Sequence, residues 1–192
     1  MLLDKLNLPY RIMVPDIDET VLENENVDNH ILRLAEGKAR KIAEIEREAL
    51  IIGCDSVCIL NGKIVSKPET HAAAVLQLKA SSGKIIYFYS GLVLYNSKTT
   101  KLQKAIVETA VHFKVLTDTM IEAYLLADKP YHCAGSIKLE SSGIMLVKKM
   151  ISDDPNSVIG LPLIALVSML ENEGLSFFRH CEEPKATTQS SS

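Results

Sequence analysis

The apolar residues of this chain recur with two different spacings. Residues 50–60 form a nearly continuous apolar run, broken only by Asp55 and Ser56, which is typical of a central strand covered on both faces. Residues 84–95 and 101–116 predict two more long strands. Asn61-Gly62 predicts a tight turn into a short strand over 63–66. Further short strands are expected at 10–14 and 143–147.

Apolar residues spaced by threes and fours predict helices between these strands. Asp28 is expected to cap a helix that runs to about Ala49, and Thr70 and Thr117 to cap helices that run to Ala80 and Ala127. A last helix is expected from near Leu161 to Asn172, and residues 1–6 resemble the end of a helix. The irregular alternation of helices, hairpins and crossovers favours an α/β fold with a mixed sheet.

Composition and charge narrow the class of protein. The 192 residues are 47% hydrophobic and 23% charged, which excludes wholesale disorder. Lys and Arg number 21 against 24 Asp and Glu, and a net charge of −3 argues against a general nucleic-acid binder. The longest apolar stretch, 158–170, is too short to cross a membrane, and residues 1–4 contain no basic leader. We therefore expect a cytoplasmic protein with no membrane segment.

The cysteines fit that expectation. Cys54, Cys58, Cys133 and Cys181 contain no C-x-x-C pair, and the first two lie in the apolar run 50–60. We interpret them as reduced, buried thiols. His132-Cys133 could suggest a nucleophile beside its base, but sequence neighbours rarely face each other and no orienting third group is evident.

Three residues stand out as chemically anomalous. Asp55 is a carboxylate in the middle of an apolar strand, where it is either satisfied by backbone donors or functional at a sheet end. Lys38 interrupts the apolar stripe of the helix predicted from residue 28, and Lys67 directly follows a strand. Each lysine alone could be a solvated charge. Together with Asp55 they resemble a site for an anionic, metal-bearing substrate.

Other acidic residues leave alternatives open. Asp16, Asp18 and Glu19 form either an additional metal-binding group or a solvated acidic turn. Glu140, in a glycine-flanked loop, could accept hydrogen bonds from a purine or face water. The sequence has no G-x-G, G-K-[ST], H-E-x-x-H or G-x-S-x-G, which excludes the corresponding dinucleotide, P-loop, zinc-protease and serine-hydrolase motifs.

Six segments, in this order and spacing, resemble the Maf family of nucleoside triphosphate pyrophosphatases, and most closely its branch that acts on 7-methyl-GTP. The segments are Val14-Pro15-Asp16-Ile17-Asp18-Glu19-Thr20, Leu32-Arg33-Leu34-Ala35-Glu36-Gly37-Lys38-Ala39, Ile51-Ile52-Gly53-Cys54-Asp55-Ser56-Val57-Cys58, Ser66-Lys67-Pro68, His132-Cys133-Ala134-Gly135-Ser136-Ile137-Lys138-Leu139-Glu140, and Asp154-Pro155-Asn156 with Ile159-Gly160-Leu161-Pro162-Leu163.

The resemblance implies a fold and an activity. It implies an elongated central sheet flanked by helices, two lobes with a cleft, and a homodimer. It implies hydrolysis of a nucleoside triphosphate to the monophosphate and pyrophosphate, with a divalent cation (Mg, Mn or Co). Asp55 would accept the proton of the attacking water and, with Glu19, hold the metal. Lys38 and Lys67 would face the phosphates.

The resemblance also bears on base preference and completeness. Ser56 and Glu140 match positions that distinguish the base, but Ser56 stands where the 7-methyl-GTP branch commonly has Gln. The family opens with a strand and a Ser-x-Ser-x-x-Arg-Arg-like loop. We therefore expect one Maf-like domain over 1–175 without that strand and loop, and a tail over 176–192, disordered from about 182. The alternatives are the dTTP/UTP branch and a nucleotide-binding protein with little or no catalysis.

Overall fold

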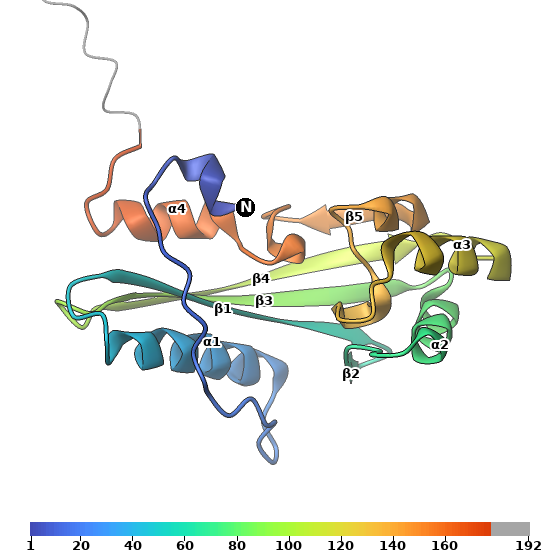
Figure 1. Ribbon diagram of the computed structural model, residues 1–192, viewed down its shortest axis with the longest axis horizontal. Helices are drawn as coiled ribbons and strands as arrows, with labels where there is room; N and C mark the ends of the chain where they lie inside the picture. The colour runs from blue at the N-terminus through green and yellow to red at the C-terminus, as the bar shows by residue number, and fades with distance from the viewer. Residues whose placement is uncertain (178–192) are drawn as a thin grey trace, which may run out of the picture.

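A five-stranded sheet with the order β2-β1-β3-β4-β5 forms the centre of the protein (Figure 1). The computed structural model describes residues 1–177. The strands are β1 (Leu50–Leu60), β2 (Lys63–Val65), β3 (Ile85–Asn96), β4 (Leu102–Phe113) and β5 (Val147–Ser152). Every strand pairing is antiparallel, so the expectation of a mixed sheet is wrong for the described residues. The pairs β1–β2 and β3–β4 are hairpins, and tight hairpins join only antiparallel strands.

The helices lie against the two faces of this sheet (Figure 1). They are α1 (Val27–Ala43), α2 (His71–Ser81), α3 (Asp118–Asp128) and α4 (Leu163–Glu171). Thr70 and Thr117 cap α2 and α3 as predicted, because each hydroxyl accepts a backbone N–H three residues ahead. Helix α1 is capped by Asn26 and not by Asp28. Over the described residues, no helix is both long and apolar enough to span a bilayer.

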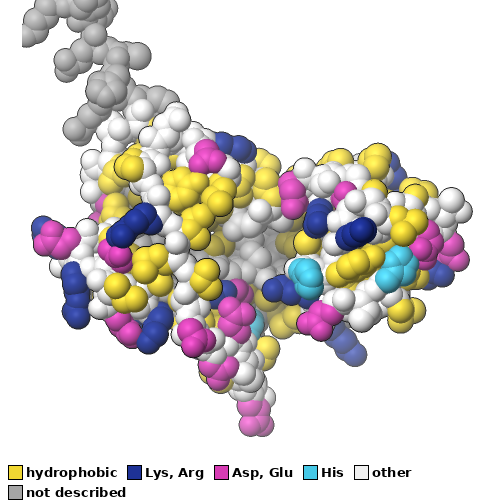
Figure 2. Space-filling view, in the orientation of Figure 1, with side chains coloured by type: hydrophobic (Ala, Val, Ile, Leu, Met, Phe, Trp, Pro, Cys, Tyr) yellow, Lys and Arg dark blue, Asp and Glu magenta, His cyan; other side chains and the backbone are white. Residues whose placement is uncertain are grey.

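The apolar core divides into two halves along the strands. In one half α1 covers one face of the sheet through Ala35 and Ala39, and α4 covers the other through Leu166 and Leu170. In the other half, helices α2 and α3 bury a separate cluster that includes Phe88. Figure 2 shows a hollow between the two masses, with charged and histidine side chains along its rim. The elongated sheet flanked by helices, with a cleft between two halves, agrees with the predicted fold class.

Two predicted elements have different bounds. Helix α1 ends at Ala43 and not near Ala49. The chain turns there toward β1, and Ile45, which continues the apolar spacing in the sequence, is 68% exposed. The strand expected at 143–147 is a 3-10 segment over Ser142–Leu146, and β5 starts at Val147. Backbone hydrogen bonds from Ser141 to Lys138 and from Ile144 to Ser141 close local turns here, so these groups do not join a strand ladder. Residues 1–6 contain a 3-10 segment, Leu3–Leu6.

The strand predicted at 10–14 is absent from the described structure. Residues 8–22 have no regular secondary structure, and this segment crosses in front of the long strands between α4 and α1 (Figure 1). Its apolar side chains find little cover, since Ile12 is 62% and Val14 91% exposed. Prolines at both ends of the stretch, Pro9 and Pro15, also remove backbone donors that a ladder would use.

This crossing segment lies over an open edge of β1. Strand β1 pairs with β3 over Leu50–Ile59, but on its other side it pairs with β2 only from Cys58 onward. Among residues 1–177, the stretch 50–57 therefore has no strand partner on that side. An apolar groove of about 800 Å³ runs beside its start, between the crossing segment and α4.

Candidate active site

Two glycines allow α1 to lie unusually close to the sheet. A Cβ on Gly53 would lie 2.0 Å from the carbonyl oxygen of Ala35, and one on Gly91 would lie 3.1 Å from Ile31. Gly91 is the β3 residue that pairs with Asp55 of β1. Helical side chains lean toward the helix N-terminus, so a long side chain one turn beyond Ala35 points back over this part of β1. That side chain is Lys38.

The ammonium of Lys38 joins two carboxylates from different parts of the chain. Lys38 Nζ donates to Asp55 Oδ1 at 2.7 Å and to Glu19 Oε1 at 2.8 Å. The side chains of Asp55 and Lys38 are 15% and 22% exposed, whereas Glu19, on the crossing segment, is 58% exposed. The structure therefore brings together three of the six predicted site residues, and Lys38 is not a solvated charge.

The charges within this triad depend on one another. Burial on its own lowers the pKa of Lys38, but hydrogen bonds with Asp55 and Glu19 outweigh it and raise the pKa above its ordinary value. The hydrogen bond from Lys38 lowers the pKa of Glu19, and the positive charge of Lys67 adds to that effect. The formal charge of two carboxylates and one ammonium is −1.

Lys67 and Glu140 lie in the other half of the molecule. Lys67 is exposed in the loop after β2; its positive charge contributes to the lowered pKa of Glu19, but among the described contacts it makes no hydrogen bond or ion pair with the triad. Burial raises the pKa of the Cys133 thiol, which lies between them in sequence. Glu140 is exposed and makes no hydrogen bond or ion pair with the triad among the described contacts. Among the described contacts, neither Lys67 nor Glu140 touches Asp55, and their roles stay predictions.

Ser56 lies on the opposite face of the sheet from Asp55, because successive strand residues alternate. Ser56 Oγ lies 2.8 Å from Ser90 Oγ, and Ser90 donates to the carbonyl oxygen of Ser157 at 2.9 Å. Thr109 continues this row of hydroxyls, 2.9 Å from Ser157 Oγ. The row separates the two apolar clusters on that face. A ligand that contacts both Asp55 and Ser56 must therefore reach around the open edge of β1.

The triad can take part in metal binding only together with other ligands. Within residues 1–177, no group of three or more His, Cys, Asp and Glu side chains is arranged to hold a metal ion. Asp55 and Glu19 converge on a single ammonium and supply two carboxylates. Mg²⁺ is commonly bound by one or two carboxylates, substrate phosphates and water, so this donor set fits such an ion.

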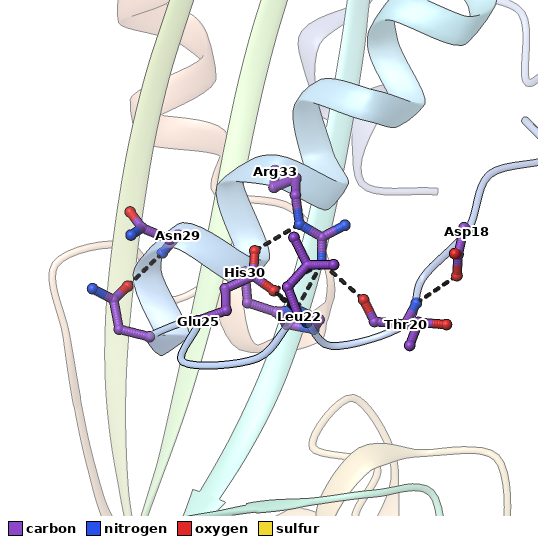
Figure 3. A network of polar contacts seen from close by, with 8 residues as sticks. Asp18, Thr20, Leu22, Glu25, Asn29, His30 and Arg33 are labelled. Atoms are coloured by element: carbon purple, nitrogen blue, oxygen red, sulfur yellow. Dashed lines mark hydrogen bonds and ion pairs between the residues drawn. The ribbon is translucent and has the colours of Figure 1, made fainter.

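A network at the start of α1 was not predicted from the sequence (Figure 3). Glu25 accepts two hydrogen bonds from Arg33, at 2.6 and 2.8 Å, and its Oε2 lies 2.9 Å from His30 Nδ1. Arg33 also donates to the carbonyl oxygen of Thr20 at 2.9 Å, and Thr20 N–H donates to Asp18 Oδ1. Glu25 precedes Arg33 by eight residues and lies outside α1, so the i, i+3 and i, i+4 spacings of helix pairs do not indicate this contact.

Of the three described cysteines, Cys58 is buried, whereas Cys54 and Cys133 are partly buried, so the interpretation as buried thiols is confirmed in full only for Cys58. Cys54, Cys58 and Cys133 are free, and burial raises the pKa of both Cys54 and Cys58 to about 12. Thiols with such pKa values stay protonated at neutral pH and are poor nucleophiles. Cys181 and the tail predicted to be disordered from about 182 lie outside the described residues.

Comparison with known proteins adds a family and several relatives. A sequence family described as "Maf-like protein" matches residues 1–173. A protein of Vibrio vulnificus named 7-methyl-GTP pyrophosphatase is 45% identical over 91% of this chain and 89% of its own length. Proteins of the same name from Methylobacillus flagellatus and Vibrio cholerae are each 46% identical, over 91% of this chain and 91% and 90% of their own lengths.

Proposed function

The chain belongs to the Maf family, and on that premise we propose that it hydrolyses 7-methyl-GTP to the monophosphate and pyrophosphate. The proposed substrate rests on the names of the relatives. The proposed location of the chemistry rests on one observation: Lys38 Nζ binds Asp55 Oδ1 and Glu19 Oε1 at once. No other ion pair in the described chain joins a cation to two carboxylates from separate segments at the cleft.

Asp55 is the proposed proton acceptor. It is the most enclosed carboxylate of the triad, and its Oδ1 is held by Lys38. A triphosphate would compete for that ammonium, because phosphate oxygens are strong acceptors for lysine. Release of Lys38 would leave the Asp55 carboxylate free to take a proton from a water that attacks the α–β anhydride. The pyrophosphate leaves with the bridging oxygen.

The charge of the triad supports the proposal that a cation takes part. A triad with a net charge of −1 repels a triphosphate at short range. A divalent cation (Mg, Mn or Co), held by Glu19 and Asp55, would reverse that charge and would stabilise negative charge on the leaving group. Lys38 and Lys67 would bind the phosphate oxygens from the two sides of the cleft. Ser56 and Glu140 are proposed to contact the base, Ser56 from beyond the open edge of β1.

Pyrophosphate release from a panel of nucleotides tests the proposal. We expect Mn²⁺-dependent release from 7-methyl-GTP, and we expect Asp55→Asn to abolish it while the melting temperature and nucleotide binding stay close to those of the wild type. Asp118→Asn, which removes an exposed carboxylate on α3, is the matched control and should keep full activity. Wild-type turnover by Asp55→Asn would refute the assigned proton acceptor.

Ser56 favours one alternative strongly enough to test. A small hydroxyl replaces the Gln typical of the 7-methyl-GTP branch, so dTTP and UTP belong in the same panel as competing substrates. Saturable binding in calorimetry without pyrophosphate release would instead identify a nucleotide-binding protein. We further propose a cytoplasmic homodimer, on the basis of the free thiols and the family resemblance. Light scattering of the purified chain tests the dimer.

A further inference from the structure

Glu19 is held in place by contacts made by its neighbours. It lies in the segment 8–22, which has no regular secondary structure. Ile17, two residues earlier, packs on α1 where Gly37 leaves room, with Cδ1 3.5 Å from the position of a Cβ on that glycine. The carbonyl oxygen of Thr20, the next residue, accepts a hydrogen bond from Arg33 Nη2 at 2.9 Å. The two anchors therefore flank Glu19 on the surface of α1.

The side chain of Arg33 is itself held in place by Glu25. The carboxylate of Glu25 accepts from Nε and Nη2 of Arg33, a two-point contact that fixes the plane of the guanidinium. The same carboxylate accepts from Leu22 N–H at 3.2 Å and contacts His30, and its side chain is only 7% exposed. The buried carboxylate of Glu25 thus links the end of the crossing segment and the turn after it to the first turns of α1 (Figure 3).

We propose that the Arg33–Glu25 pair positions Glu19 for metal and phosphate binding at the triad. This inference rests on the proposed function, because it assumes that Glu19 helps to hold the cation. Arg33 does not touch the triad; it sets the backbone at Thr20 and so the direction in which the Glu19 carboxylate points. Groups that orient metal-binding side chains in this way commonly change metal affinity by about 10- to 100-fold when they are removed.

The test compares Arg33→Gln with Arg40→Gln. Arg40 lies on the same helix and pairs with Glu36 at 2.6 Å, so its loss removes a similar ion pair without touching the crossing segment. Mn²⁺ affinity is measured in the presence of pyrophosphate from the spin resonance of free Mn²⁺. Backbone mobility is measured by hydrogen–deuterium exchange of the peptide that spans residues 17–25.

We expect Arg33→Gln to weaken Mn²⁺ affinity about tenfold or more and to increase exchange in residues 17–25. The maximal turnover at saturating Mn²⁺ should stay within about twofold of wild type, so that the metal requirement changes and the rate does not. Arg40→Gln should match the wild type in all three measurements. Equal Mn²⁺ affinity and exchange in the two variants would overturn the proposal.

A double-mutant cycle separates positioning from general stability. If Arg33 acts through Glu19, Arg33→Gln should add no further loss of Mn²⁺ affinity to Glu19→Gln, whereas additive losses would contradict the proposal. Should Arg33→Gln not fold, Glu25→Gln weakens the same pair with less disruption and is expected to show the same pattern. A wild-type protein that binds Mn²⁺ and pyrophosphate but releases no product would refute the proposed function and leave this test unaffected.

Discussion

The closeness of α1 to the sheet predicts a graded response to alanine at three glycines. A Cβ on Gly53 would lie 2.0 Å from the carbonyl oxygen of Ala35, about 1.4 Å inside the 3.4 Å at which ordinary contact begins. Because the obstacle is helix backbone, α1 must move as a unit. A Cβ on Gly91 would lie 3.1 Å from the backbone of Ile31, which requires a shift of only a few tenths of an ångström.

The third glycine, Gly37, should respond in the opposite direction. A Cβ there would meet Ile17 Cδ1 at an ordinary 3.5 Å, and Gly37 lies inside α1, where alanine is favoured by about 1 kcal/mol. Overpacking costs about 1–3 kcal/mol, and for a chain of this size 1 kcal/mol shifts the melting temperature by about 2–4 °C. We therefore expect Gly53→Ala to lower it by about 2–12 °C, Gly91→Ala by less, and Gly37→Ala to raise it slightly.

Calorimetry with a parallel activity assay checks this order. Gly53→Ala should also lose turnover at temperatures where it remains folded, because displacement of α1 carries Lys38 away from Asp55. Gly37→Ala should keep its turnover and thus serves as the control. The reasoning would be refuted if Gly53→Ala were as stable as the wild type, or if it kept full activity with a lowered melting temperature.

Two further predictions concern buried carboxylates. The hydrogen bond from Arg33 is the largest of the effects that lower the pKa of Glu25 to about 2. The stabilisation by the ionised Glu25 carboxylate is therefore complete above the unfolded pKa of about 4.5 and is lost as pH falls toward 2. Wild type should thus lose more stability than Arg33→Gln between pH 4.5 and 2 in urea titrations, and parallel curves would contradict this. Asp154, which is 2% exposed, accepts the backbone N–H of Ile164 at 2.6 Å at the start of α4. Asp154→Ala should cost about 1–3 kcal/mol in the same urea titrations, and a loss below about 0.5 kcal/mol would show that this cap contributes little.

The sequence predicted the elements whose signals are local. The apolar run of β1 and the threonine caps of α2 and α3 depend on neighbouring residues only, and these elements are confirmed. The strand expected at 10–14 failed because a strand needs a partner, and pairing is not a local property. Residues 28–49 were predicted as one helix because Ile45 continues the apolar spacing, although it faces solvent in the structure.

The candidate site was predictable in part. Asp55 and Lys38 stood out because each charge interrupts an apolar pattern, and the structure places them in contact. Glu19 and Lys67 interrupt no apolar pattern, so the residues alone left them as candidates beside a solvated alternative, and the family resemblance assigned their roles. The Glu25–Arg33 pair could not be foreseen, because its role depends on how residues 8–22 fold back on α1. Ser56 shows that neighbours in the sequence need not share a site. It follows Asp55 in the same strand, and its side chain therefore lies on the other face of the sheet.

We expect the open edge of β1 to favour self-association at high concentration. Residues 50–57 present a row of backbone donors and acceptors without a strand partner in the described part of the chain, beside an apolar groove. Such an edge is a template for sheet growth between molecules. Only the crossing segment, with its own exposed apolar side chains, lies in front of it. Loosening of residues 8–14 is therefore expected to start aggregation while both halves of the core are still folded.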